Sequence, residues 1–264
     1  MGLFKRRMSL LLLYGFVALS ALLALSALRF TGTLAFAEAQ DAPVSPEAAR
    51  DWSGALKLVK DGRPDAVIIV SAEADERETK AARTLAEYVL KSTGAELPVM
   101  TKDELGRTGM ENNGKYRIYI GGSVATEDEH VAQALEGLDG DGFVIHPHGN
   151  RLTIAGPTSW GTLNGAYAFL EKYVGVRWLM PGPDGEDVPQ RADLSVPRED
   201  VREEPAFTYR VISPMTGSPD TPGPMQLQYE WAQRNRLQGS ANWRINFIHY
   251  LYALFPPEKY GATH

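Results

Sequence analysis

The sequence predicts an α/β protein, a mixed β-sheet with helices packed on it, followed by the first elements of a truncated (β/α) barrel. Between residues 66 and 200, short apolar runs of strand length alternate with amphipathic segments of helix length. Two neighbouring strand-like runs are joined by a short Gly/Asn connection, as in a β-hairpin, so the sheet is expected to be mixed. Residues 201–264 open a second strand–helix–strand unit, but a complete barrel needs about 200 residues.

The first strand and helix of the predicted domain are the clearest. The run Ala66–Val70 is continuously apolar, as in a strand buried on both faces. The stretch EADERETKAARTLAEYVLKSTG has apolar residues at helical spacing, an acidic start, and Gly94 where a C-terminal cap belongs. Leu97–Met100 is predicted as an edge strand because it contains a proline. KYRIYIGG predicts a third strand and TEDEHVAQALEGL a short helix.

The stretch DGDGFVIHPHGNRLTIAG predicts a turn followed by a hairpin. Its two strand-like runs are Gly142–His146 and Arg151–Ala155, with PHGN between them. DGDG lacks the twelve-residue pattern of a calcium loop, so it is interpreted as the turn into the hairpin.

The segment GPTSWGTLNGAYAFLEKYVG predicts a structural helix. Thr158 or Ser159 is suited to cap its start, and an apolar stripe at spacings of 4, 3 and 4 faces the sheet: Leu163, Tyr167, Leu170 and Val174. Gly165 indicates close approach to a neighbouring segment. The glycines do not form G-x-G-x-x-G and no G-K-[ST] follows, so a phosphate loop and a Rossmann-like nucleotide site are disfavoured.

His146 and His148 are candidate metal ligands, because strand alternation places both on one face. A third ligand would have to come from His130, His249 or His264, all far along the chain. Two histidines fall short of the usual three or four ligands. We therefore predict an exposed hairpin tip and no metal site.

Composition narrows the function classes. The chain has a net charge of −6, and without residues 1–37, which hold four basic residues and no acidic one, the net charge is −10. Such acidity disfavours nucleic acid, whose phosphates are bound by Lys and Arg, and is compatible with neutral sugars. There is no cysteine, so disulfides, thiolate metal sites and cysteine nucleophiles are excluded. No cofactor is expected.

The N-terminus has the plan of a secretory signal. Three basic residues at positions 5–7 precede an apolar run from Met8 to Leu28, and residues 35–37 have the A-x-A form of a cleavage site. The apolar run is also long enough to span a bilayer. Residues 1–37 are therefore either a cleaved signal peptide or a retained membrane anchor, and both alternatives predict export to the periplasm, cell surface or medium.

The remaining regions are a linker and the C-terminal unit. Residues 38–65, rich in Ala, Pro and Asp, are predicted as a linker before the α/β domain at 66–200. A strand is expected at Leu194–Val196, and the Glu203-Glu204 pair is expected to be solvated. PAFTYRVIS then predicts a strand, MQLQYEWAQRNRL a helix and ANWRINFIHYLYALFPP a strand. G-x-S-x-G is absent and no catalytic constellation is visible.

The order of these parts resembles a known arrangement. YIGG, then the hairpin and the helix ending in GVRWLMPG, then EEPAFTYR resemble the N-terminal accessory domain of family 20 hexosaminidases and family 67 α-glucuronidases. In those enzymes a strand pair of the form dGF-i…l-I-G precedes a helix of the form G…y-t-LleK-GvRW. The stretch AQRNRLQGSANWRINFIHYLYALFPPEKYGATH is similar to bacterial proteins with domain of unknown function 4838. The resemblance covers about residues 66–264.

The resemblance implies that residues 66–200 are a non-catalytic accessory domain and that the catalytic acids lie on barrel strands beyond His264. It also implies two substrate-binding residues: Arg210, at the end of the first expected barrel strand, would contact the sugar, and His249, after the second, would lie near the sugar pocket. The whole protein would then hydrolyse O-glycosyl bonds in glycans, and this chain alone would be inactive. The alternative is a non-catalytic carbohydrate-binding or cell-surface module whose tryptophans stack on sugars: Trp52, Trp160, Trp178, Trp231 and Trp243. The sugar and the oligomeric state stay open.

Overall fold

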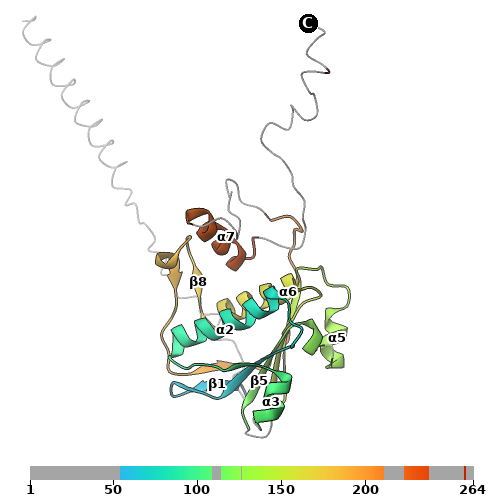
Figure 1. Cartoon of the computed structure of the whole chain (residues 1–264), viewed down its shortest axis with the longest axis vertical. Helices are drawn as coiled ribbons and strands as arrows, with labels where there is room; N and C mark the ends of the chain where they lie inside the picture. Colours follow the sequence, from blue (N-terminus) through green and yellow to red (C-terminus); the bar gives the residue numbers. More distant parts are fainter. Residues whose placement is uncertain (1–53, 109–113, 126, 211–222, 238–258, 260–264) are drawn as a thin grey trace, which may run out of the picture. The chain divides into compact units, whose positions relative to one another are not determined.

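A six-stranded mixed sheet lies at the centre of the computed structural model, with helices on both of its faces (Figure 1). The structure describes residues 54–108, 114–125, 127–210, 223–237 and 259. These residues belong to one compact unit, Asp51–His264. The expected division into two domains near residue 200 stays a prediction.

The sheet has the strand order β11-β6-β7-β5-β3-β4. Parallel pairing joins β4, β3, β5 and β7, whereas β6 is antiparallel to both β7 and β11. The strands span, in sheet order, Val201–Glu203, Phe143–His148, Arg151–Ala155, Tyr116–Ile120, Ala66–Val70 and Val99–Thr101. The predicted α/β class with a mixed sheet is confirmed, and β4 is an edge strand as its proline indicated.

One face of the sheet is covered by two long helices, α2 (Glu76–Thr93) and α6 (Ser159–Phe169), which also pack against each other. Asp75 caps α2 by accepting hydrogen bonds from two backbone N–H groups, and Gly94 ends it in the left-handed conformation at φ 74°. Alternate strand residues such as Ile68 and Ile118 point to this side and join the largest core cluster.

The helix α6 is structural, as predicted. Thr158 accepts hydrogen bonds from the backbone of Trp160 and Gly161, and every residue from Gly161 to Phe169 is buried. A π-helical turn, η3 (Leu170–Val174), continues the helix and ends at Gly175. Gly165 lies against the sheet, because a Cβ placed there would be 2.9 Å from the Ile154 side chain.

The other face of the sheet is covered by two seven-residue helices, α3 (Lys102–Thr108) and α5 (Glu129–Leu135). They bury two small clusters, one around Leu105 and one around Val131. The four-residue helix α4 (Gly122–Ala125) follows β5. This face therefore has much thinner cover than the α2/α6 face.

Part of the expected linker is a strand. β1 (Leu56–Lys60) pairs with β10 (Leu194–Val196) on one side and β2 (Arg63–Pro64) on the other, in a separate three-stranded sheet. Leu56 and Leu58 are buried in the large core. The linker predicted over 38–65, with one weak segment around Ala55–Val59, thus contains the strand β1 at that segment, and the partner of β1 lies far along the sequence, at the expected strand β10.

The hairpin differs from its prediction in length. β6 continues through Pro147 and His148, so only Gly149 and Asn150 form the connection. Pro147 is tolerated because β11 pairs only with Phe143–Ile145. No strand therefore lies beside Pro147 on that side to accept the hydrogen bond that its missing N–H would have donated.

The expected strand PAFTYRVIS is not formed in its described part, residues 205–210. The strand lies just before it, as β11, because these residues reach β6 and Pro205 then lacks the N–H needed to extend the ladder. The predicted helix is present as α7 (Pro224–Arg234). Residues 238–258, with the second expected strand, lie outside the described residues.

A short hairpin completes the described structure: β8 (Arg177–Trp178) pairs with β9 (Glu186–Asp187), and the 3-10 turn η4 (Pro183–Gly185) lies between them. In the described part of the chain, no helix is long and apolar enough to cross a membrane. The N-terminal segment expected to be a signal or anchor is not among the described residues.

Candidate functional site

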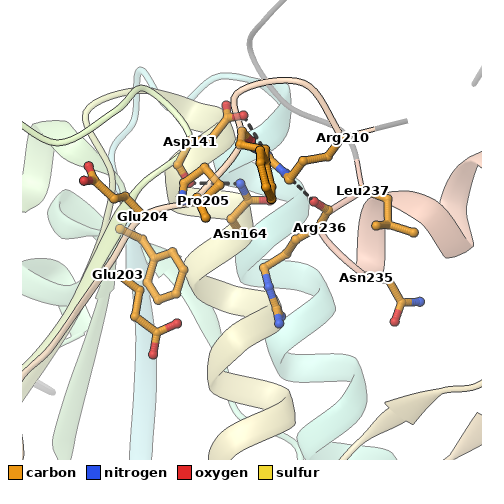
Figure 2. Close-up of a pocket in the computed structure, with 12 residues that line it drawn as sticks. Asp141, Asn164, Glu203, Glu204, Pro205, Arg210, Asn235, Arg236 and Leu237 are labelled. Carbon is orange, nitrogen blue, oxygen red and sulfur yellow. Dashed lines mark hydrogen bonds and ion pairs between the residues drawn. The ribbon is translucent and has the colours of Figure 1, made fainter. Parts of the chain in front are cut away.

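A pocket of about 250 Å³ lies where the chain after β11 and the end of α7 meet the α/β domain (Figure 2). The residues that line it come from the turn before β6 and the first residue of β6, from α6, from the end of β11 and the segment after it, and from the residues that follow α7. They are Asp141, Phe143, Asn164, Glu203, Glu204, Pro205, Ala206, Phe207, Arg210, Asn235, Arg236 and Leu237.

The turn before β6 is held rigidly against α6, which is why Asp141 has a fixed position. Asp139 accepts a hydrogen bond from the backbone N–H of Asp141, and its carbonyl accepts one from Gly142. Asn164 on α6 donates to the backbone carbonyl of Asp141 at 3.0 Å, and the Thr158 hydroxyl donates to that of Gly140. The DGDG segment is thus a turn, as expected, and it carries a fully buried carboxylate.

Arg210 is paired with that buried carboxylate. Its Nη2 lies 2.8 Å from the Asp141 Oδ2, and the side chains of Arg210 and Asp141 are 14% and 0% exposed. The Nε of Arg210 donates to the backbone carbonyl of Arg236, and its Nη1 to that of Phe207 (Figure 2). Arg210 therefore connects the segment before α7, the end of α7 and the α/β domain.

Of the two substrate-binding residues predicted from the sequence, the structure describes only Arg210. Arg210 lines the pocket, but all three of its side-chain nitrogens donate to protein acceptors, so a sugar contact by Arg210 stays a prediction. His249 lies outside the described residues.

The two adjacent carboxylates at the pocket, Glu203 and Glu204, are both exposed, as expected. Glu204 accepts a hydrogen bond from the Asp139 backbone N–H at 3.1 Å. Successive side chains along an extended segment point to opposite sides, and in Figure 2 the two carboxylates lie apart from the Arg210 guanidinium.

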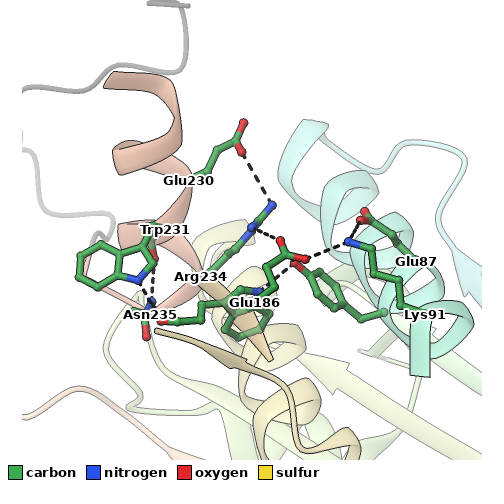
Figure 3. A network of polar contacts seen from close by, with 9 residues as sticks. Glu87, Lys91, Glu186, Glu230, Trp231, Arg234 and Asn235 are labelled. Atoms are coloured by element: carbon green, nitrogen blue, oxygen red, sulfur yellow. Dashed lines mark hydrogen bonds and ion pairs between the residues drawn. The ribbon is translucent and has the colours of Figure 1, made fainter. Parts of the chain in front are cut away.

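A second polar cluster fastens α7 to α2 and β9 (Figure 3). At its centre, Glu186 accepts hydrogen bonds from the Tyr88 hydroxyl at 2.6 Å, the Arg234 Nη1 at 2.7 Å and the Lys91 Nζ at 3.0 Å. Burial by itself would raise the pKa of Glu186, but the hydrogen bonds from Tyr88 and Lys91 and the charge of Arg234 hold that pKa below its usual value. Burial and the bond to Glu186 raise the pKa of Tyr88 to about 12.

The three described tryptophans mainly contribute to packing. Trp178 is buried, lies edge-on to Tyr88 and Tyr167, and donates to the Tyr88 hydroxyl. Trp231 on α7 is half-buried and donates to the Trp178 carbonyl, and the guanidinium of Arg77 lies 4.4 Å from the centroid of the half-buried Trp160 ring. The expectation that Trp178 stacks on sugars is wrong because its ring is inside the core. The other two candidates, Trp52 and Trp243, lie outside the described residues.

One group of side chains has the composition of a metal site. Asp128, His146 and His148 each offer a ligand atom, and these atoms lie within 4.8 Å of one another. The sequence placed the two histidines on one face of a strand but missed Asp128. The only signal for Asp128 in the sequence was its position at the expected start of a helix, two residues before His130. The sequence did not indicate that this helix, α5, packs on β6 and so brings Asp128 to the histidines.

Several solved structures resemble part of this chain. No protein-family model and no curated protein sequence matches it. The β-N-acetylhexosaminidase of glycoside hydrolase family 20 from Streptomyces coelicolor A3(2) is 15% identical, over 59% of this chain and 24% of that chain, with a TM-score of 0.37. The N-acetyl-β-hexosaminidase from Streptomyces plicatus is 15% identical, over 59% of this chain and 24% of that chain, with a TM-score of 0.36.

An enzyme of glycoside hydrolase family 138 that targets pectin rhamnogalacturonan II is also similar, with 14% identity over 40% of this chain and 13% of that chain and a TM-score of 0.28. The chain thus spans about a quarter of the length of the hexosaminidases it matches. These neighbours are glycoside hydrolases, and each match covers only part of both chains. The links to family 67 and to domain of unknown function 4838 stay predictions.

Proposed function

We propose that residues 66–200 form a non-catalytic accessory domain in an exported glycoside-hydrolase-like protein that acts on glycans. In this proposal the domain binds the segment that follows it, from the end of β11 through α7. Arg210, which lines the pocket, and His249 are the proposed sugar contacts.

The observation that carries the proposal is the buried pair between Arg210 and Asp141. An arginine on the segment after β11 ends at a fully buried carboxylate of the α/β domain, and removing either partner of such a pair is costly. The cluster around Glu186 adds a second attachment. The Glu186 carboxylate accepts hydrogen bonds from Arg234 of α7 and also from Tyr88 and Lys91 of α2. Polar groups that saturate one another in this way favour a docking role over a catalytic one.

The three carboxylates that line the pocket also support an accessory role. Asp141 is paired with Arg210 and fully buried, and the exposed Glu203 and Glu204 are neighbours whose side chains diverge. A glycosidase needs two carboxyl groups about 5 to 10 Å apart across the scissile bond, or one with help from the substrate.

Hydrolysis of aryl-glycosides tests the proposal. The purified 264-residue chain is incubated with aryl-glycosides of N-acetylglucosamine and of glucuronic acid, and no turnover above that of a mock purification is expected. A variant with both Glu203→Gln and Glu204→Gln is the matched control. Turnover by the chain that this double variant loses would overturn the non-catalytic role.

A carbohydrate-binding module is the second candidate, and the exposed Phe207 favours it. The Phe207 ring is 75% exposed and lines the same pocket as Arg210, and exposed rings beside polar donors suit sugars. Binding of the chain to a glycan array, compared with binding by a Phe207→Ala variant, decides between the two. Saturable binding that the variant loses would support the module, and no binding would support the accessory role alone.

A further inference from the structure

We propose that Asp128, His146 and His148 form a binding site for a divalent transition-metal ion, with one carboxylate and two imidazoles as ligands. The site lies on the thinly covered face of the sheet, where β6 meets the start of α5. It is independent of the proposed accessory role, because none of its residues takes part in the attachment of α7.

The three side chains already lie close to a ligating arrangement. Their ligand atoms are within 4.8 Å of one another, and the Nδ1 of His148 is 3.9 Å from the Oδ2 of Asp128. Ligand atoms bound to zinc at about 2.0–2.2 Å lie roughly 3.4 Å apart in a tetrahedral site. His148 is exposed and can rotate to close the difference, whereas Asp128 and His146 are mostly buried.

Local structure holds the carboxylate in place. Asp128 is the N-cap of α5, where its Oδ1 accepts a hydrogen bond from the His130 backbone N–H at 3.0 Å. At the other end of α5, the Arg202 guanidinium donates to the carbonyls of Ala134 and Glu136. Val131 of α5 packs on Val144 of β6. Both ends and the middle of α5 are thus fixed over the strand that carries the two histidines.

His146 is prepared for a metal by a carboxylate just before β11, that of Asp200. Its Nδ1 lies 2.6 Å from Asp200 Oδ1, and the register that pairs Val201 with Ile145 brings the two residues together. If Nδ1 carries the proton for this bond, Nε2 holds a free lone pair. The Nε2 atom is buried and makes no hydrogen bond. A carboxylate behind a ligating histidine is the usual support in metal sites.

The surrounding charges are compatible with a bound cation. Arg151 faces His148 across the hairpin register, but its guanidinium lies 4.0 Å from the Tyr119 ring centroid on β5, on the side away from β6. The His130 ring stacks near His146, with centroids 6.2 Å apart, and adds a third imidazole beside the site.

The ligand set selects the class of metal. Imidazole nitrogen suits Zn²⁺, Cu²⁺, Ni²⁺ and Co²⁺, whereas Mg²⁺ and Ca²⁺ prefer oxygen alone. Three protein ligands leave at least one position for water or another molecule, as in open zinc sites. We therefore infer a zinc-class site with an exchangeable position.

Titration of the full chain with Zn²⁺ tests the inference. After treatment with a chelator, Zn²⁺ is added in competition with a colorimetric indicator, and one ion per chain is expected. Asp128→Asn and His148→Ala should each weaken binding at least about tenfold, and Asp200→Asn by about 10- to 100-fold, the effect of losing a supporting carboxylate. Glu129→Gln, which removes a neighbouring charge, should bind as the unchanged chain does.

These variants are chosen to fold. Asparagine caps a helix as well as aspartate, and His148 is exposed, so circular dichroism should be unchanged. Co²⁺ provides a second readout, since its visible absorption should change with Asp128→Asn. Equal Zn²⁺ affinity in the unchanged chain and in the Asp128→Asn, His148→Ala double variant would overturn the proposal. So would binding that is lost instead in a His249→Ala, His264→Ala variant.

Discussion

The two faces of the six-stranded sheet are built from the same strands but carry different kinds of residues. On the α2/α6 face, alternate strand side chains join one large cluster that contains Leu85, Tyr167 and Phe169. On the α3/α5 face, the other alternate side chains form two small clusters around Leu105 and Val131. The histidines and Asp128 gather on this second face. Stability is thus concentrated on one face, and the thinly covered face can hold polar groups that a large core would exclude.

The difference in stability between the two faces is tested most directly by the same substitution, Leu→Ala, on each face. Leu85→Ala should lower the free energy of unfolding by about 4 kcal/mol, since the rigid surroundings of the large cluster cannot close the cavity. Leu105→Ala should cost about 2 kcal/mol, because its small cluster can collapse around the gap. Urea unfolding followed by circular dichroism measures both values. Equal losses would mean that the two faces contribute alike.

Removal of Arg210 tests whether its pair with Asp141 attaches the segment after β11 to the α/β domain. Arg210→Met should cost about 3 kcal/mol, because the fully buried Asp141 then keeps an uncompensated charge. The double variant Asp141→Asn, Arg210→Met should recover part of the loss. Thermal unfolding measures both, with the exposed Arg83→Met as the control expected to change little. A single variant as stable as Arg83→Met would show that the pair does not fasten the segment.

The close approach of α6 to the turn before β6 gives the third test. A Cβ on residue 161 would lie 2.1 Å from the Gly142 carbonyl oxygen. Gly161→Ala should therefore destabilise by about 2 kcal/mol, despite the helix propensity that alanine adds. Gly122→Ala is the matched control, since its nearest neighbour would be 3.6 Å away. Melting temperatures of the two variants should differ accordingly, and equal values would contradict the packing argument.

The sequence predicted the elements whose patterns are local and missed those that depend on distant partners. The apolar run of β3, the cap and stripe of α6 and the existence of the hairpin all follow from neighbouring residues. By contrast, β1 depends on β10 and β11 on β6, and no pattern within Val201–Glu203 marks it as a strand. The third ligand was missed for the same reason, since Asp128 reaches the histidines only because α5 packs on β6.

The carboxylate on the large-core side should give a pH-dependent effect. The pKa of Glu186 is lowered from 4.5 by hydrogen bonds and positive charges that outweigh its burial. A lowered carboxyl pKa adds stability above the unfolded value, and this stability is lost as pH falls through the folded value. Glu186→Gln should therefore cost about 1.5 kcal/mol at pH 7 and progressively less below pH 4.5. Urea unfolding at pH 7 and at pH 3.5 measures the change; a constant difference would contradict it.

The carboxylate on the thinly covered face, Asp128, should contribute little to the stability of the metal-free chain. Asp128→Asn removes a charge but keeps the cap of α5, so the metal-free chain should lose less than about 0.5 kcal/mol. With Zn²⁺ present, the melting temperature of the unchanged chain should rise more than that of the variant, because an ion that binds only the folded state stabilises it in proportion to the logarithm of its affinity. Melting with and without Zn²⁺ separates the two contributions. A large loss without metal would show that Asp128 is structural, and the contrast between the two faces would then not extend to their carboxylates.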